Sequence, residues 1–176
     1  MNDRNDIVLV GDGFVGKTSI VNALTKKSFD VSSNPNIINE TEVEIAELSS
    51  SIKFNMIDTA GQEEYDFARK ESYEKANLFL LCFCVHDFNS FDNIRTKWAK
   101  ELDLYKNVPK ILISTKCDEK EKDFIKRNEI EKLRRKINCV EYIESSAKTL
   151  EGIETILQTA YRVLNTKETK RSCVIS

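Results

Sequence analysis

The stretch GDGFVGKTS, residues 11–19, decides the fold of this chain. Three of its residues are glycine, whereas the whole sequence of 176 residues contains only five glycines. The apolar run IVLV, residues 7–10, stands directly before it and predicts a short buried strand. Glycines between a strand and a helix let backbone N–H groups converge on an anion, and the N-terminus of the helix points at the same place. The stretch therefore predicts a phosphate-binding loop.

The spacing of this loop fits G-x-x-x-x-G-K-[ST] from Gly11 to Thr18. In such a loop Lys17 reaches the β- and γ-phosphates, and the Thr18 hydroxyl ligates Mg²⁺. A chance glycine turn is the alternative, and the preceding strand disfavours it. The loop residues predicted to bind the nucleotide are Gly13, Phe14, Val15, Gly16, Lys17, Thr18 and Ser19.

A second motif, DTAGQ at residues 58–62, follows a strand-like pattern. Asp58 at the strand end is the expected second anchor for Mg²⁺. Gly61 brings its N–H close to the γ-phosphate, and Gln62 orients the attacking water, so we predict Gln62, Lys17 and Gly61 as catalytic. An isolated Asp at a strand end is more often a turn residue, but behind a phosphate-binding loop the functional interpretation is favoured.

Two further motifs, TKCD at residues 115–118 and SSAK at residues 145–148, indicate which base is bound. A carboxylate such as Asp118 accepts two parallel hydrogen bonds from the N1–H and 2-amino group of guanine, which adenine cannot offer. A site built on such bonds discriminates by roughly 10⁴-fold. The Lys116 stem lies along the ring, and the Ala147 N–H donates to guanine O6. The predicted base-binding residues are Thr115, Lys116, Asp118, Ser146, Ala147 and Lys148.

Apolar runs alternate with helical patterns along the rest of the chain. The runs at 78–85, 110–114 and 140–143 are of buried-strand type, and the alternating patterns on either side of residues 49–51 predict a hairpin. Helical periods occur at 91–102, 124–137 and 153–164. The order predicts an α/β P-loop fold with a six-stranded, mostly parallel sheet, one antiparallel hairpin and helices on both faces.

Composition narrows the function classes. The formal charge is −2 and the pI about 5.6, which argues against nucleic acid as a partner. The five cysteines have no regular spacing, and Cys82 and Cys84 lie in an apolar run, so we interpret them as core residues of a reduced, cytosolic protein. The polar start predicts no signal peptide, and no apolar run is long enough to span a bilayer.

Together the motifs resemble the Ras superfamily of small GTPases over nearly the whole chain, and the Rho/Rac branch most, through GDGFVGKTS, DTAGQEEYD, TKCD and FDNIRTKWAKEL. The resemblance implies a switch that binds GTP or GDP with Mg²⁺, hydrolyses GTP and signals to the actin cytoskeleton. Its mobile loops would be residues 30–41 and 59–75. It also implies a monomer with an exchange factor, a GTPase-activating protein, effectors and a dissociation inhibitor as partners. Phe29 occupies the place of an aromatic that stacks on guanine, with plain core packing as its alternative.

Two departures from that family stand out. Only one charged helix fits between TKCD and SSAK, so the extra helix of the Rho branch is expected to be absent. Asn36 stands where the family has a threonine that ligates Mg²⁺ and contacts the γ-phosphate. The Asn36 carbonyl can reach the metal at a different length, which predicts a looser first switch loop. A harmless substitution is the equally weighted alternative.

The sequence ends in CVIS, which fits a prenylation box at Cys173, with farnesyl favoured by the terminal serine. We therefore expect a GTPase domain over residues 1–165 and a flexible tail over 166–176. Together they predict a protein of the cytoplasm and the cytoplasmic face of the plasma membrane.

Three functions remain distinct at this stage. The first is a Rho-like GTPase, the second a guanine-nucleotide-binding module with little turnover because of Asn36, and the third an ATP-dependent P-loop enzyme, which TKCD and SSAK disfavour. Trp98 is either a half-buried helix residue or a partner contact.

Overall fold

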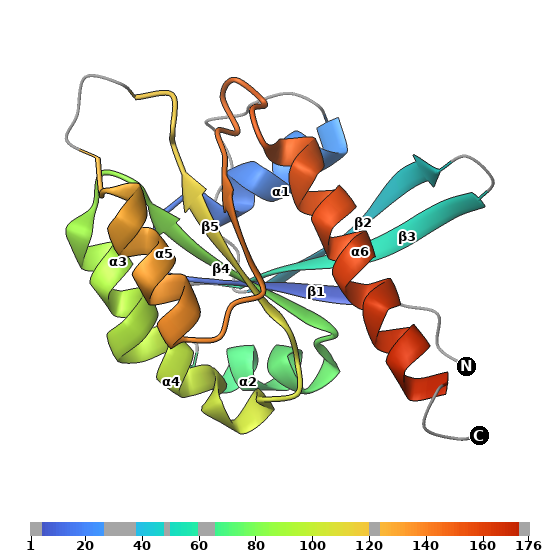
Figure 1. Ribbon diagram of the computed structural model, residues 1–176. Coiled ribbons are helices and arrows are strands. Elements are labelled where there is room, and N and C mark those ends of the chain that lie inside the picture. The colour runs from blue at the N-terminus through green and yellow to red at the C-terminus, as the bar shows by residue number, and fades with distance from the viewer. Residues whose placement is uncertain (1–4, 27–37, 48–49, 60–65, 120–123, 173–176) are drawn as a thin grey trace.

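The computed structural model describes residues 5–26, 38–47, 50–59, 66–119 and 124–172 and contains a six-stranded sheet in the order β2-β3-β1-β4-β5-β6 (Figure 1). Its strands are β1 (Asn5–Val10), β2 (Ile38–Glu47), β3 (Ser50–Thr59), β4 (Leu78–Cys84), β5 (Lys110–Thr115) and β6 (Glu141–Glu144). Only β2 and β3 pair antiparallel. The predicted fold class and hairpin are confirmed.

Strand β1 lies inside the sheet, and its apolar residues pack into the hydrophobic cores on both faces. Ile7 and Leu9 belong to one core cluster, and Val8 and Val10 belong to the other. This alternation follows from the two-residue period of a strand, and it explains the unbroken apolar run in the sequence. Chain segments that follow β1, β4, β5 and β6 all leave from the carboxyl edge, where parallel sheets bind ligands.

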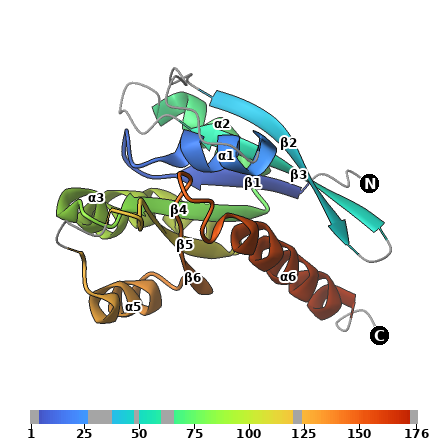
Figure 2. The same ribbon diagram turned by 90° about the horizontal axis from the view of Figure 1, so that it is seen from above.

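Helices cover both faces of the sheet. One face carries α1 (Lys17–Lys26) and α6 (Ile153–Ser172); the other carries α2 (Asp66–Lys75) and α5 (Arg127–Lys136). Figure 2 shows α6 on the side of the strands away from α3 and α5. Cys82 and Cys84 are buried, free thiols on the same face as α1 and α6, as expected for core cysteines.

The connection from β4 to β5 is one continuous run of helical turns. It starts with α3 (Phe88–Asn93), widens to the π-helical turn η2 (Ile94–Trp98), and ends with α4 (Ala99–Glu101) and the 3₁₀ turn η3 (Leu102–Tyr105). The Asp87 carboxylate caps the N-terminus of α3 by accepting from two backbone N–H groups. Between β5 and β6 the described residues form a single helix, α5, in agreement with the expected absence of the extra Rho-branch helix.

Helix α6 extends further along the chain than its apolar pattern indicates. The apolar period ends at Leu164, and a flexible tail was expected from residue 166, but the helix continues to Ser172. A helix that has started adds each further residue at low cost, so it can continue past its last apolar residue. Among the described helices none is long and apolar enough to cross a membrane.

Candidate functional site

The loop between β1 and α1 has a backbone that only glycine tolerates at its first position. Gly11 has φ +151°, and a Cβ on it would lie 2.1 Å from the Cys82 carbonyl oxygen of the neighbouring strand. Gly16 has φ +105°. Phe14 is also at positive φ, with its side chain 86% exposed. These conformations wrap the loop around the N-terminus of α1, which is the geometry of a phosphate cradle.

Lys17 is held inside this loop. Its side chain is only 6% exposed, and its ammonium donates to the Gly11 carbonyl at 2.8 Å and to the Asp12 carbonyl at 2.7 Å. Burial lowers the pKa of Lys17, and the nearby Asp58 carboxylate opposes that shift. A buried ammonium that is bonded only to two carbonyls is a ready partner for an anion placed in the loop.

Asp58, at the end of β3, meets the first turn of α1. The Thr18 hydroxyl donates to its Oδ2, whereas Oδ1 is buried without any hydrogen-bond partner. Burial raises the pKa of Asp58 even though the Thr18 hydrogen bond and Lys17 favour the charged form. A buried carboxylate oxygen without a partner is costly, and a cation next to Thr18 would satisfy it.

The residues present fit a magnesium ion better than an all-protein metal site. In the part of the chain that the structure describes, no three His, Cys, Asp or Glu side chains cluster to hold a metal. One hydroxyl and one carboxylate are the few protein oxygens that Mg²⁺ uses when substrate phosphates supply the others. The chemistry of Thr18 and Asp58 therefore matches Mg²⁺ held together with a nucleotide.

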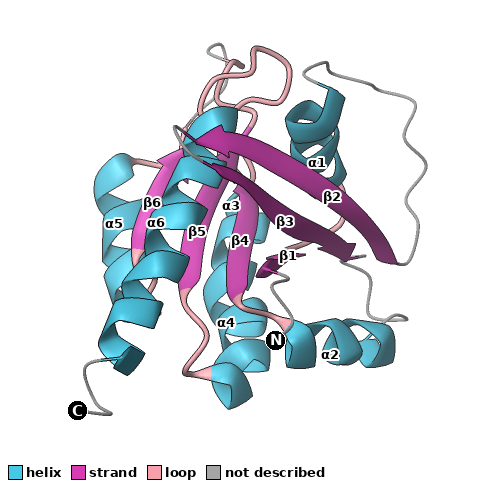
Figure 3. Ribbon diagram, turned by 90° about the vertical axis from the view of Figure 1, so that its right-hand side faces the viewer, coloured by secondary structure: helices cyan, strands magenta, loops and turns pink. Residues whose placement is uncertain are grey.

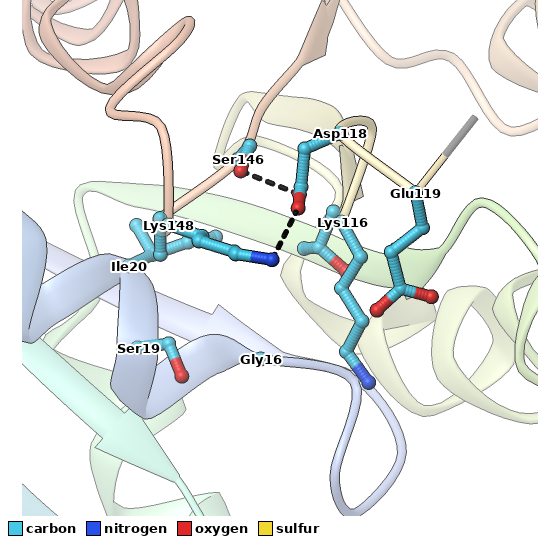
Figure 4. Close-up of a pocket in the computed structure, with 10 residues that line it drawn as sticks. Gly16, Ser19, Ile20, Lys116, Asp118, Glu119, Ser146 and Lys148 are labelled. Carbon is cyan, nitrogen blue, oxygen red and sulfur yellow. Dashed lines mark hydrogen bonds and ion pairs between the residues drawn. The ribbon is translucent and has the colours of Figure 1, made fainter. Parts of the chain in front are cut away.

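The opposite end of the site is built from the segments after β5 and β6. The Ser146 hydroxyl donates to Asp118 Oδ1 at 2.6 Å, and the Lys148 ammonium lies 3.7 Å from Oδ2 (Figure 4). The Ser146 hydrogen bond is the main cause of the lowered pKa of Asp118. Asp118 is therefore held in its charged form, with its position set before any ligand arrives.

Two more hydrogen bonds tie this end to the phosphate loop. The Lys116 ammonium donates to the Phe14 carbonyl at 3.0 Å, and the Thr115 hydroxyl donates to the Val15 carbonyl. A pocket opens between α1 and these two segments (Figure 4). It is lined by Gly16, Ser19, Ile20, Thr115, Lys116, Asp118, Glu119, Ser146, Ala147 and Lys148.

Comparison with known proteins identifies the family to which this geometry belongs. The model of the Ras family matches residues 6–166. The chain is 37% identical to the Rho-related protein racC of Entamoeba histolytica, with 94% of this chain and 93% of that protein covered. It is 32% identical to the Ras-like GTP-binding protein RhoL of Drosophila melanogaster, with 96% and 93% covered. The GTP-binding protein rho2 of Schizosaccharomyces pombe is 31% identical, with 98% and 96% covered.

The chain belongs to the Rho branch of the Ras superfamily of small GTPases. It is a GTPase, and guanine nucleotides, regulators and effectors are the ligands and partners of this family in general.

In this GTPase the structure brings most of the predicted site residues together. The described members of the phosphate loop surround the start of α1, and Thr115, Lys116, Asp118, Ser146, Ala147 and Lys148 line one pocket. Five predicted residues lie outside the described part of the chain: Phe29, Asn36, Gly61, Gln62 and Cys173. Their predicted roles stay predictions.

Sequence reasoning missed the support behind the phosphate loop. The Trp98 indole N–H donates to Asp12 Oδ1 at 2.7 Å, and the Asn93 amide donates to Oδ2 at 2.7 Å. Trp98 is fully buried, which contradicts both alternatives from the sequence, a half-buried helix residue and a partner contact. The π-helical turn η2 ends at Trp98, and such turns often occur at functional positions.

Arg69 of α2 was also missed. It is completely buried, its guanidinium lies 5.1 Å from the centroid of the Trp98 ring, and its Nε donates to Glu101 at 3.3 Å. The Tyr73 hydroxyl donates to the same carboxylate at 3.0 Å. These contacts join the phosphate loop to α2, which follows the DTAGQ motif. The sequence gives no signal for this role, because Arg69 is followed by the charged residues Lys70 and Glu71 and its burial follows from packing.

Proposed function

We propose that this GTPase binds GTP and GDP together with Mg²⁺ and switches between two states when GTP is hydrolysed. The observation that carries the proposal is the buried, unpartnered Asp58 Oδ1, with the Thr18 hydroxyl bonded to the other carboxylate oxygen and the Lys17 ammonium close enough to favour the charged form. Thr18 and Asp58 would hold the ion, which supplies charge neutralisation between the β- and γ-phosphates when bound.

The chain's own residues account for binding and orientation. Lys17 exchanges its two carbonyl partners for phosphate oxygens, and the N-terminus of α1 contributes its N–H groups. Asp118 accepts from the guanine edge, with Ser146 and Lys148 keeping its carboxylate in place. Gly61 and Gln62 remain our candidates for contacting the γ-phosphate and orienting the attacking water.

The test measures GDP and GTP affinity with and without Mg²⁺, in competition with ATP, on purified protein. We expect guanine nucleotides to win by several orders of magnitude and Mg²⁺ to slow GDP release. Equal retention of adenine nucleotides would overturn the assignment of Asp118, and nucleotide release that ignores Mg²⁺ would overturn the assignment of Thr18 and Asp58.

A second candidate is a guanine-nucleotide-binding module with weak switching, and Asn36 is the observation that favours it. Its side-chain carbonyl differs in length from a threonine hydroxyl, and this difference would loosen the first switch loop and slow turnover. Single-turnover hydrolysis separates the candidates: the Asn36→Thr variant should hydrolyse GTP faster than the parent if Asn36 impairs the switch, and at the same rate if the substitution is harmless.

The remaining proposals concern lipid modification, cellular location and partners. We propose prenylation at Cys173, a location at the cytoplasmic face of the plasma membrane, a monomeric state and signalling to the cytoskeleton. An exchange factor, an activating protein and a dissociation inhibitor complete the set of partners. The 87% exposed ring of Phe67 on α2 supports protein partners there. A mass increase of one prenyl group at Cys173 in cells, absent from Cys173→Ser, tests the anchor.

A further inference from the structure

A basic groove lies on the molecule away from the nucleotide site. It runs between η2, the segment before β5 and the end of α5, with a volume of about 750 Å³. We call it the basal groove. Its fourteen lining residues include one acid, Asp103, and five cations: Arg95, Lys100, Lys106, Lys110 and Lys136. This excess is notable because the chain as a whole carries a formal charge of −2.

The cations of the basal groove have few partners within the protein. Arg95 pairs with Asp92 on its own helical run. Among the described residues, no carboxylate pairs with the four lysines of the groove. Lys110 lines the groove as well, with 8% of the residue exposed. Five cations against one acid leave the groove with an excess of positive charge, which attracts an anion.

The chain topology fixes where the basal groove faces. Residues 106–109 and 137–140 precede the parallel strands β5 and β6, so they lie at the amino edge of the sheet, opposite the nucleotide site. Helix α6 starts at the carboxyl edge after β6 and runs back, so Ser172 comes to that same amino edge. Figures 1 and 3 agree, with the end of α6 and the turn before β5 both at the lower end of the molecule.

Apolar side chains accompany the cations at this end. Leu104 in η3 is 88% exposed, and Val140, which lines the groove, is 48% exposed. Exposed leucine next to unpaired lysines matches the boundary between lipid headgroups and acyl chains, where apolar groups insert and cations meet phosphates.

We propose that the basal groove docks on the anionic headgroups of a phospholipid bilayer and sets how the GTPase sits on the membrane. The proposal deepens the membrane anchoring proposed above, since Cys173 directly follows the last residue of α6. With helix rather than flexible tail before the anchor, the domain stays close to the lipid surface. The groove then meets the headgroups, and the nucleotide site faces the cytosol.

The experiment uses the full chain with Cys173→Ser, so that binding cannot come from a lipid anchor. Its partition onto vesicles of phosphatidylcholine, with and without phosphatidylserine, is measured by sedimentation in the presence of GDP. We expect binding only to the serine-containing vesicles and weakening by salt. The double variant Lys106→Gln/Lys136→Gln should lower the partition coefficient roughly thirty-fold, given the usual contribution of each lysine at an anionic surface.

A matched control removes the same charge at the other end of α5. Lys126→Gln/Arg127→Gln alters exposed residues at the N-terminus of that helix and should keep the partition close to that of the parent. Equal loss in both double variants, or equal binding to both kinds of vesicle, would overturn the proposal; so would selective capture of an acidic protein without vesicle binding. Retention of GDP in each sample keeps this outcome separate from failure of the nucleotide site.

Discussion

The two ends of the nucleotide site differ in how complete they are without a ligand. At the guanine end, Asp118 is already held by Ser146 and faces Lys148. At the phosphate end, Lys17 is bonded only to two carbonyls of its own loop, and Asp58 keeps one buried oxygen without a partner. One end is preorganised by protein contacts, and the other depends on what binds.

The difference assigns base selectivity and sensitivity to the phosphates to different ends of the site. A preorganised base pocket gives selectivity in both nucleotide states, because guanine is common to GTP and GDP. An incomplete phosphate end makes local stability depend on the ligand, since anything that binds only the folded state stabilises it. Sensitivity to the number of phosphates therefore belongs to the end that carries Lys17 and Asp58.

The largest effect is expected at the guanine end. Asp118→Asn removes a charged acceptor of two hydrogen bonds, so GDP affinity should fall on the order of 10³-fold. Xanthosine diphosphate, which offers an acceptor where guanine has its 2-amino group, should regain affinity. Competition with a labelled nucleotide measures both. The control Lys148→Gln changes a side chain that is 70% exposed and should cost little; a comparable loss there would contradict the assigned role of Asp118.

At the phosphate end, a substitution should stabilise the nucleotide-free protein. Asp58→Asn removes a buried charge, so the nucleotide-free protein should gain about 1–3 kcal/mol in free energy of unfolding. The same variant should lose the Mg²⁺ dependence of GDP release. Urea unfolding in the presence of a chelator measures the first effect. Asp12→Asn is the matched control, and it should destabilise the protein because both Asp12 oxygens accept hydrogen bonds.

The pH dependence of that gain follows from the raised pKa of Asp58. The folded state keeps the proton at a pH where the unfolded chain has released it. The contribution of Asp58 to stability therefore falls as pH rises from about 3.8 through the raised pKa of the folded state. Asp58→Asn should lack this slope, and an unchanged slope in the variant would contradict the assignment.

A smaller effect is expected from the support behind the phosphate loop. Trp98→Phe keeps a ring but removes the N–H that Asp12 accepts from, so the free energy of unfolding should fall by about 2 kcal/mol. The rate of GDP release should rise, because Asp12 also provides a carbonyl to Lys17. A double-mutant cycle with Asp12→Ala, which removes the acceptor, isolates the bond, and strictly additive losses would mean that the two residues do not act together.

The smallest effect should come from Ser146→Ala. Losing the hydroxyl bond to Asp118 should weaken GDP binding about tenfold at neutral pH. Because that bond holds the pKa of Asp118 below 3.8, its removal raises the pKa. GDP affinity should then decline at a higher pH than in the parent when the solution is acidified. Calorimetric titration over a pH series measures this shift. If GDP affinity declined at the same acidic pH in the parent and in Ser146→Ala, preorganisation by Ser146 would be contradicted.

Much of the site was predictable because its determinants are local. The positive φ of Gly11 and Gly16 and the apolar strand before them fix the phosphate loop within ten residues of sequence. The motifs that end in Asp118 and Lys148 each follow a strand that the apolar pattern reveals. Since parallel strands deliver their carboxyl ends to one edge, their order alone brings these loops together.

Other features depend on residues that meet only after folding. Asp12 and Trp98 are 86 positions apart, and nothing in either neighbourhood indicates that the indole N–H reaches that carboxylate. The unpartnered oxygen of Asp58 and the burial of Arg69 depend likewise on the packing of several elements.

The amino-acid sequence by itself determined the fold class, the phosphate loop and the choice of guanine, because these follow from short-range backbone constraints and the period of apolar residues. Only the tertiary structure decided which charges are satisfied. It gathered lysines from three separate elements into the basal groove and left Asp58 with a free buried oxygen. The physical reason is that the cost of a charge depends on its surroundings in space, and those surroundings come from distant parts of the chain.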